Sequence, residues 1–123
     1  MKRVALVTGG TGFLGSWLIR SLISRNCHKI YVLARRDSKH SAKNRVYQAL
    51  RAHKNGAILH RAHRLVEVVD GDLCELRLGL SRRITHSLLR QITDIFHVGA
   101  QADLRAQLAT LRHPNVTGTR HVL

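Results

Sequence analysis

The residues of this chain that are spaced for chemistry lie at its start, in a glycine-rich stretch. Residues 4–7 are apolar and predict a buried strand, and Thr-Gly-Gly-Thr-Gly-Phe-Leu-Gly follows from Thr8 to Gly15. In a strand–turn–helix unit, such glycines permit the tight turn, the approach of a pyrophosphate and close helix packing. Amides at the start of the following helix would face the anion. The stretch predicts a dinucleotide site, and a glycine turn with a purely structural role is the alternative.

The glycines satisfy two spacings at once. Gly10-x-Gly12-x-x-Gly15 is the general dinucleotide fingerprint, and Gly9-x-x-Gly12-x-x-Gly15 is a variant of it. A Thr-Gly-x-x-Gly-x-x-Gly sequence after a first strand resembles the extended short-chain dehydrogenase/reductases. The expected cofactor-binding residues of this stretch are Thr8, Gly9, Gly10, Thr11, Gly12, Phe13, Leu14 and Gly15.

A dinucleotide site also needs a group at the end of the second strand, where the adenosine ribose lies. About twenty residues beyond the glycines, an acid would bind the free 2′-hydroxyl of NAD, whereas an arginine suits the 2′-phosphate of NADP. Arg35 and Arg36 occupy this place, with Asp37 close by. The planar guanidinium matches a phosphate, so NADPH is expected over NADH. The alternative is that both arginines face solvent.

Alternating strands and helices of this size predict an α/β fold. The expected strands are residues 4–7, 30–34, 65–69 and 94–98, and the expected helices are 13–25, 41–53, 81–91 and one from Pro114 onward. Leu14, Trp17, Leu18, Leu22 and Ile23 form the stripe expected to face the sheet. Such units predict a doubly wound parallel sheet (a Rossmann fold) of strand order 3-2-1-4, with the ligand at the switch between strands 1 and 4.

Between the second and third strands the chain is strongly basic. Residues 35–64 contain Asp37 as their single acid, and Asn55-Gly56 predicts a helix stop or turn within them. His60-x-x-His63 could share a helix face and bind a metal, but arginines flank the pair and no carboxylate or thiol is adjacent. A solvated basic turn without metal is the favoured interpretation.

Composition narrows the class of protein. The chain has 123 residues, 44% of them hydrophobic, and 21 Lys and Arg against 7 Asp and Glu give a net charge of +14. That excess predicts attraction to acidic surfaces. Only 4% of residues are aromatic and no recognition motif is present, so nucleic-acid binding is disfavoured. Cys27 and Cys74 are expected as buried thiols in a reducing compartment, and with no signal peptide or membrane span a cytoplasmic location is expected.

Five motifs in one order carry a family resemblance. They are Thr8 to Gly15, Leu33-Ala34-Arg35, Gly71-Asp72-Leu73 with Leu78-Gly79-Leu80-Ser81, His97-Val98-Gly99-Ala100, and Asn115-Val116-Thr117-Gly118-Thr119. This series resembles the N-terminal half of thioester reductase domains of nonribosomal peptide synthetases and carboxylic acid reductases, and fatty acyl-CoA reductases share much of it. Residues 1–123 would thus be an NAD(P)-binding domain truncated after its fourth strand.

The resemblance implies roles for the matched residues. Gly9 to Gly15 would hold the pyrophosphate and Arg35 the 2′-phosphate, while Asp72 and Leu73 would border the adenine. Gly99 and Ala100 would lie against the nicotinamide-side ribose, and Asn115 would sit near the active centre. For Asp72, a strand-end acid that caps its own loop is an equal alternative.

The family's reducing residues are a Tyr-x-x-x-Lys pair and a Ser or Thr further along the chain. Here Tyr31 is followed by Arg35 and Tyr47 by Arg51, so no catalytic residue is expected. The resemblance implies the cofactor-binding part of an NADPH-dependent reductase of acyl thioesters, with an acidic acyl-carrier domain or a coenzyme A thioester as partner. A non-catalytic dinucleotide-binding module is the alternative. Self-association through the exposed fourth strand is also expected.

Overall fold

A computed structural model describes residues 2–99 and 113–123. Ala100 therefore lies outside the described residues, as do Leu104, Leu108 and Leu111, whose spacing predicts a helical or partly helical stretch. The strands are β1 (Val4–Thr8), β2 (Lys29–Ala34), β3 (Val66–Asp70) and β4 (Asp94–His97). The longer helices are α1 (Phe13–Ser24), α2 (Ala42–Arg51), α3 (Gly56–Leu65) and α4 (Arg82–Gln91). Short helical segments are η1 (Leu76–Gly79), η2 (His113–Thr117) and α6 (Gly118–Val122).

The four strands form one parallel sheet of order β3-β2-β1-β4, which confirms the predicted doubly wound topology. In register, Thr8 at the end of β1 lies beside Leu33 of β2 and His97 of β4. Because all strands run the same way, their carboxyl ends meet at one edge of the sheet. That edge is where open α/β sheets bind ligands.

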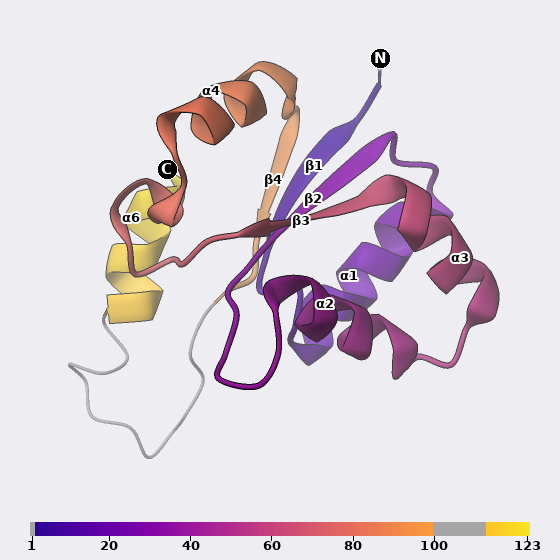
Figure 1. Cartoon of the computed structure of the whole chain (residues 1–123). Helices are drawn as coiled ribbons and strands as arrows, with labels where there is room; N and C mark the ends of the chain where they lie inside the picture. Colours follow the sequence, from indigo (N-terminus) through magenta and orange to yellow (C-terminus); the bar gives the residue numbers. More distant parts are fainter. Residues whose placement is uncertain (1, 100–112) are drawn as a thin grey trace.

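Helices cover both faces of the sheet. Figure 1 shows α1, α2 and α3 on one side, and α4 and α6 on the other. Alternate residues of β1 serve the two layers: Ala5 and Val7 join the core under α1–α3, while Val4 and Leu6 join a smaller cluster with Leu88 of α4. A strand buried on both faces explains why residues 4–7 are continuously apolar.

The face that α1 turns toward the sheet differs from the predicted stripe. Leu22 and Ile23 are buried as expected, but Leu14 is 65% and Trp17 is 42% exposed, so the prediction was wrong for these two. The buried positions are Gly15, Ser16, Ile19, Leu22 and Ile23. This rotation brings Gly15 against the turn that precedes the helix, a contact in which a larger residue would not fit.

A second correction concerns the basic region. Asn55-Gly56 does not end a helix but starts α3, because the Asn55 side chain accepts a hydrogen bond from the amide of Ile58 and caps the new helix. His60 and His63 therefore lie on a helix rather than on a turn. His63 stacks on the ring of Tyr47 from α2, with ring centroids 5.0 Å apart.

Two further points concern burial and membranes. Both cysteines are free thiols, and Cys27 is buried as predicted, whereas Cys74 is only half-buried.

Among the described residues, none of the helices has the length and apolar character needed to cross a bilayer.

Candidate dinucleotide site

The turn after β1 is built so that glycine is required at both of its ends. Gly9 has a φ of +76°, and a Cβ there would meet the backbone of Val98 and Gly99 at 2.6–2.9 Å. A Cβ on Gly15 would collide with the carbonyl oxygen of Gly9. Gly10 is similarly confined, by Val32 of β2 at 2.5 Å and Ile19 of α1 at 2.9 Å.

Gly12 differs from these three because the protein itself does not require it. A Cβ on Gly12 would meet only the Gly9 carbonyl oxygen, at an ordinary 3.5 Å, and its φ of −85° suits any residue. Gly12 is also the N-cap of α1, where no side chain caps the helix and no acidic residue lies in the first turn. The first amides of α1 have no partner within the helix, which is the arrangement that favours an anion at a helix start.

Thr8 joins the turn to the end of β4. Its side chain is fully buried, and its hydroxyl oxygen accepts hydrogen bonds from the amides of Val98 at 3.1 Å and Gly99 at 3.0 Å. The same oxygen lies 2.7 Å from Nδ1 of His97. The Thr8 side chain thus positions the two strands that flank the ligand crevice.

Leu73 and Gly99 bring the loop after β3 to the same place. A Cβ on Gly99 would meet Leu73 at 2.6 Å and the amide nitrogen of Gly9 at 3.2 Å. The carbonyl oxygen of Leu73 lies 2.6 Å from Nδ1 of His121, which donates to it from α6. The segments that follow β1, β3 and β4 are therefore packed together.

Arg35 and Arg36 follow β2 directly and are exposed. The neighbouring acid, Asp37, is engaged within its own turn: its Oδ1 accepts from the amides of Lys39 at 2.8 Å and His40 at 2.6 Å. Arg45 lies 3.6 Å from the other carboxylate oxygen. These amide hydrogen bonds, with the charges of His40 and Arg45, lower the pKa of Asp37.

Asp72 caps its own loop. Its Oδ1 accepts the amide hydrogen of Cys74 at 2.9 Å, which is the structural role considered as the alternative for this residue. Burial raises the pKa of the Cys74 thiol, and the Asp72 carboxylate adds to the effect, while the charge of Arg35 opposes it. The ends of β2 and β3 thus lie close together, and a role of Asp72 beside adenine stays a prediction.

Both tyrosines of the chain hydrogen-bond to other elements of the fold. The Tyr31 hydroxyl is 2.8 Å from Oε1 of Gln91, and the buried Tyr47 hydroxyl is 3.2 Å from the carbonyl oxygen of Ala62. Both hydroxyls therefore serve packing between elements. Within residues 2–99 and 113–123, no three His, Cys, Asp or Glu side chains are grouped as metal ligands.

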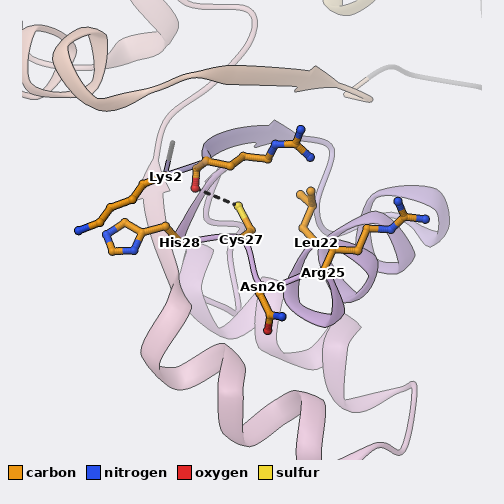
Figure 2. Close-up of a pocket in the computed structure, with 7 residues that line it drawn as sticks. Lys2, Leu22, Arg25, Asn26, Cys27 and His28 are labelled. Carbon is orange, nitrogen blue, oxygen red and sulfur yellow. Dashed lines mark hydrogen bonds between the residues drawn. The ribbon is translucent and has the colours of Figure 1, made fainter.

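A separate hollow of about 420 Å³ lies at the opposite edge of the sheet, where β1 begins and α1 ends. Figure 2 shows Lys2 and His28 together on one side of it and Arg25 on the other, with Cys27 between them. The Cys27 thiol is 3.4 Å from the carbonyl oxygens of Arg3 and Lys29. This hollow is remote from the strand ends that the predicted site residues follow.

His97 and Thr119 were not among the predicted site residues, although both fall within the motifs that carry the resemblance. The structure links them to Thr8 through hydrogen bonds across the sheet edge. Asn115 lies in η2, one turn before Thr119, and its carbonyl oxygen accepts the Thr119 hydroxyl at 2.7 Å. The motifs could have drawn attention to His97 and Thr119, but their hydrogen-bond partners are visible only in the folded chain.

A parallel sheet of this order, with a glycine turn leading into a helix, defines a Rossmann-type dinucleotide-binding domain. The chain belongs to the male sterility protein family of NAD-binding domains, whose model matches residues 7–123. This confirms the predicted resemblance to thioester reductases.

Known relatives and solved structures support the same family assignment. A linear gramicidin synthase protein of Brevibacillus parabrevis is 34% identical over 98% of this chain, which spans 2% of that protein. Fatty acyl-CoA reductase 2 of Mus musculus is 31% identical over 96% of the chain, which spans 24% of it. The terminal R domain of the myxalamid PKS-NRPS pathway has a TM-score of 0.81 and 33% identity, with 98% of this chain and 30% of that one covered.

Proposed function

We propose that this chain is the NADPH-binding part of a reductase that acts on acyl thioesters. The choice of NADPH rests on the charged residues that follow β2. Arg35 and Arg36 are exposed there, while the carboxylate of Asp37 is already bonded to the amides of its own turn. A ribose 2′-phosphate would find two cations at this place, whereas the acid that follows β2 directly, Asp37, is engaged within its own turn.

The other site residues would hold the rest of the cofactor. Gly12 and the first amides of α1 would bind the pyrophosphate, in the space that no protein side chain fills. Leu73 would border the adenine, and Gly99 would lie against the nicotinamide-side ribose. Asn115 would lie near the reacting centre. When bound, NADPH supplies a hydride. The residues of this chain would bind and orient it.

The choice of acyl thioesters rests on the relatives, which include a fatty acyl-CoA reductase and a terminal R domain of a peptide synthetase pathway. No Tyr-x-x-x-Lys pair occurs in this sequence, and we therefore assign it binding rather than proton transfer. The charge of +14 suits an acidic acyl-carrier domain or a coenzyme A thioester as the partner. Two free cysteines among the described residues favour a reducing compartment such as the cytoplasm.

Titration of the purified chain with NADPH and NADH tests the cofactor choice. A charge-assisted contact contributes about 1.5–3 kcal/mol, so NADPH should bind roughly ten- to a hundredfold more tightly. Arg35→Asp should remove most of that preference, and the exposed Arg64→Asp on α3 is a control that should keep it. Equal affinities in the wild type, or an unchanged preference in Arg35→Asp, would count against the proposal.

A further inference from the structure

His97 lies where three separate parts of the chain meet. Its Nδ1 is 2.7 Å from the hydroxyl of Thr8 in β1, and its Nε2 is 2.8 Å from the hydroxyl of Thr119 in α6. The imidazole therefore bridges the end of β1, which leads into the glycine turn, and the helix that follows Asn115. Neither the predicted site nor the proposed function uses this side chain.

The donors and acceptors in this series of hydrogen bonds can be assigned in one consistent way. The Thr8 oxygen already accepts two amide hydrogens, from Val98 and Gly99, so its own hydrogen is donated to Nδ1 of His97. His97 is then a neutral imidazole with its hydrogen on Nε2, which it donates to Thr119. The Thr119 hydroxyl in turn donates to the carbonyl oxygen of Asn115 at 2.7 Å.

The surroundings favour this neutral form. Burial lowers the pKa of His97, and no charged side chain in the described ranges shifts it further. A proton on Nδ1 would face the Thr8 oxygen, whose own hydrogen would lose its acceptor. Protonation of the ring would therefore disrupt the bridge rather than strengthen it.

The position of α6 depends on few other polar contacts. Besides the bond from His97 to Thr119, the described contacts include one from His121 to the carbonyl oxygen of Leu73. Val122 adds a partly buried apolar contact to the smaller core cluster. Both polar anchors of α6 thus reach loops or strand ends at the edge that would bind the dinucleotide.

We propose that His97 is a positioning residue that couples the dinucleotide turn to the segment carrying Asn115. A cofactor that fixes the turn after Thr8 would also fix His97 and, through Thr119, the start of α6. Cofactor binding would in this way order residues that the family resemblance places near the reacting centre. The inference rests on the proposed cofactor site but has a readout that needs no cofactor.

The test uses the full chain, its Thr119→Val variant and Thr85→Val as a matched control. Thr85 in α4 donates its hydroxyl to the carbonyl oxygen of Ser81, the same helical bond that Thr119 makes, whereas among the described contacts it is Thr119 whose hydroxyl also meets a histidine nitrogen. Nitrogen NMR of the wild type should show the His97 hydrogen on Nε2. Without cofactor, amides of residues 118–122 should exchange about tenfold faster in Thr119→Val, the effect of losing a hydrogen bond, and at an unchanged rate in Thr85→Val.

With NADPH added, the amides of residues 118–122 should exchange more slowly in the wild type and in Thr85→Val. Thr119→Val should bind NADPH with an affinity within about threefold of wild type, but its amides should not gain this protection. A hydrogen on Nδ1 of His97, or equal protection by NADPH in Thr119→Val and wild type, overturns the inference. If NADPH does not bind the wild type, the proposed function fails by itself, and the exchange rates without cofactor still decide whether His97 holds α6.

Discussion

The Cβ position of Gly15 falls on the carbonyl oxygen of Gly9, so the helix and the turn before it are in direct backbone contact. Gly12, three residues away, has no comparable neighbour. The fold therefore requires glycine at position 15 but not at position 12, where the proposed site assigns the requirement to the pyrophosphate. This difference gives a direct experiment.

Substitution of these two glycines should separate stability from binding. Gly15→Ala should lower the free energy of unfolding by about 1–3 kcal/mol or more, because the added methyl group forces the helix away from the turn. Gly12→Val should fold normally but lose NADPH affinity by at least about tenfold, because its side chain fills the space left for the pyrophosphate. Thermal melts and NADPH titrations measure the two effects, and tight NADPH binding by Gly12→Val would contradict the site.

Acid should destabilise the fold through two histidines. Burial lowers the pKa of both His97 and His53, and the charge of Arg20 adds to the effect at His53. In the unfolded chain they take up protons near about pH 6.5. The unfolded state then binds more protons than the folded one, so the free energy of unfolding should fall as the pH drops below about 6.5.

Urea unfolding at pH 7.5 and at pH 5 measures this loss. His53→Gln should reduce it, since glutamine does not titrate and its amide can still donate to Ser16, which His53 Nε2 contacts at 3.0 Å. His60→Gln, at an exposed position on α3, should leave the loss unchanged. Equal stability of the wild type at the two pH values would refute the prediction.

Binding of an acidic carrier domain should depend steeply on salt. Helices α2 and α3 contain no acidic residue and carry the cations Lys43, Arg45, Arg51, Arg61 and Arg64. Exposed charges are screened over about 10 Å at 0.1 M salt, so raising the salt from about 0.05 M to 0.5 M should weaken the complex at least about tenfold. Pull-down at both salt concentrations measures it. Salt-independent capture, or a preference for DNA over carrier domains, would argue against this partner.

The fourth strand should promote association of the isolated chain. β4 is an edge of the sheet in the part of the chain that the structure describes, and Ile95 at its centre is 50% exposed. An apolar edge of this kind is a template for pairing. Ile95→Lys should reduce the self-association seen by light scattering, with Leu89→Lys on α4 as an exposed apolar control. A wild type that stays monomeric at high concentration would exclude this mode.

The strands could be predicted from the sequence because continuous apolar runs and glycine turns are local signals. Their order followed from the alternation of strands and helices, which is typical of a doubly wound sheet. It failed at α3 because Asn-Gly suits both the end and the start of a helix, and the bond from Ile58 to Asn55 is visible only in three dimensions. It also misplaced Trp17, since the rotation of α1 is set by contact with Gly9 rather than by apolar spacing. The partner of Thr8 could not be predicted, because His97 lies 89 positions away.

That separation has a consequence for how the chain folds during synthesis. β1 is synthesised before the other three strands, yet it lies between β2 and β4, and its second neighbour is the last of the four to be made. One side of β1 therefore stays unpaired until Asp94–His97 has been made. Contacts so distant in sequence close slowly, and an unpaired apolar strand aggregates easily. Chaperone binding to the nascent chain should thus concentrate on Val4–Thr8.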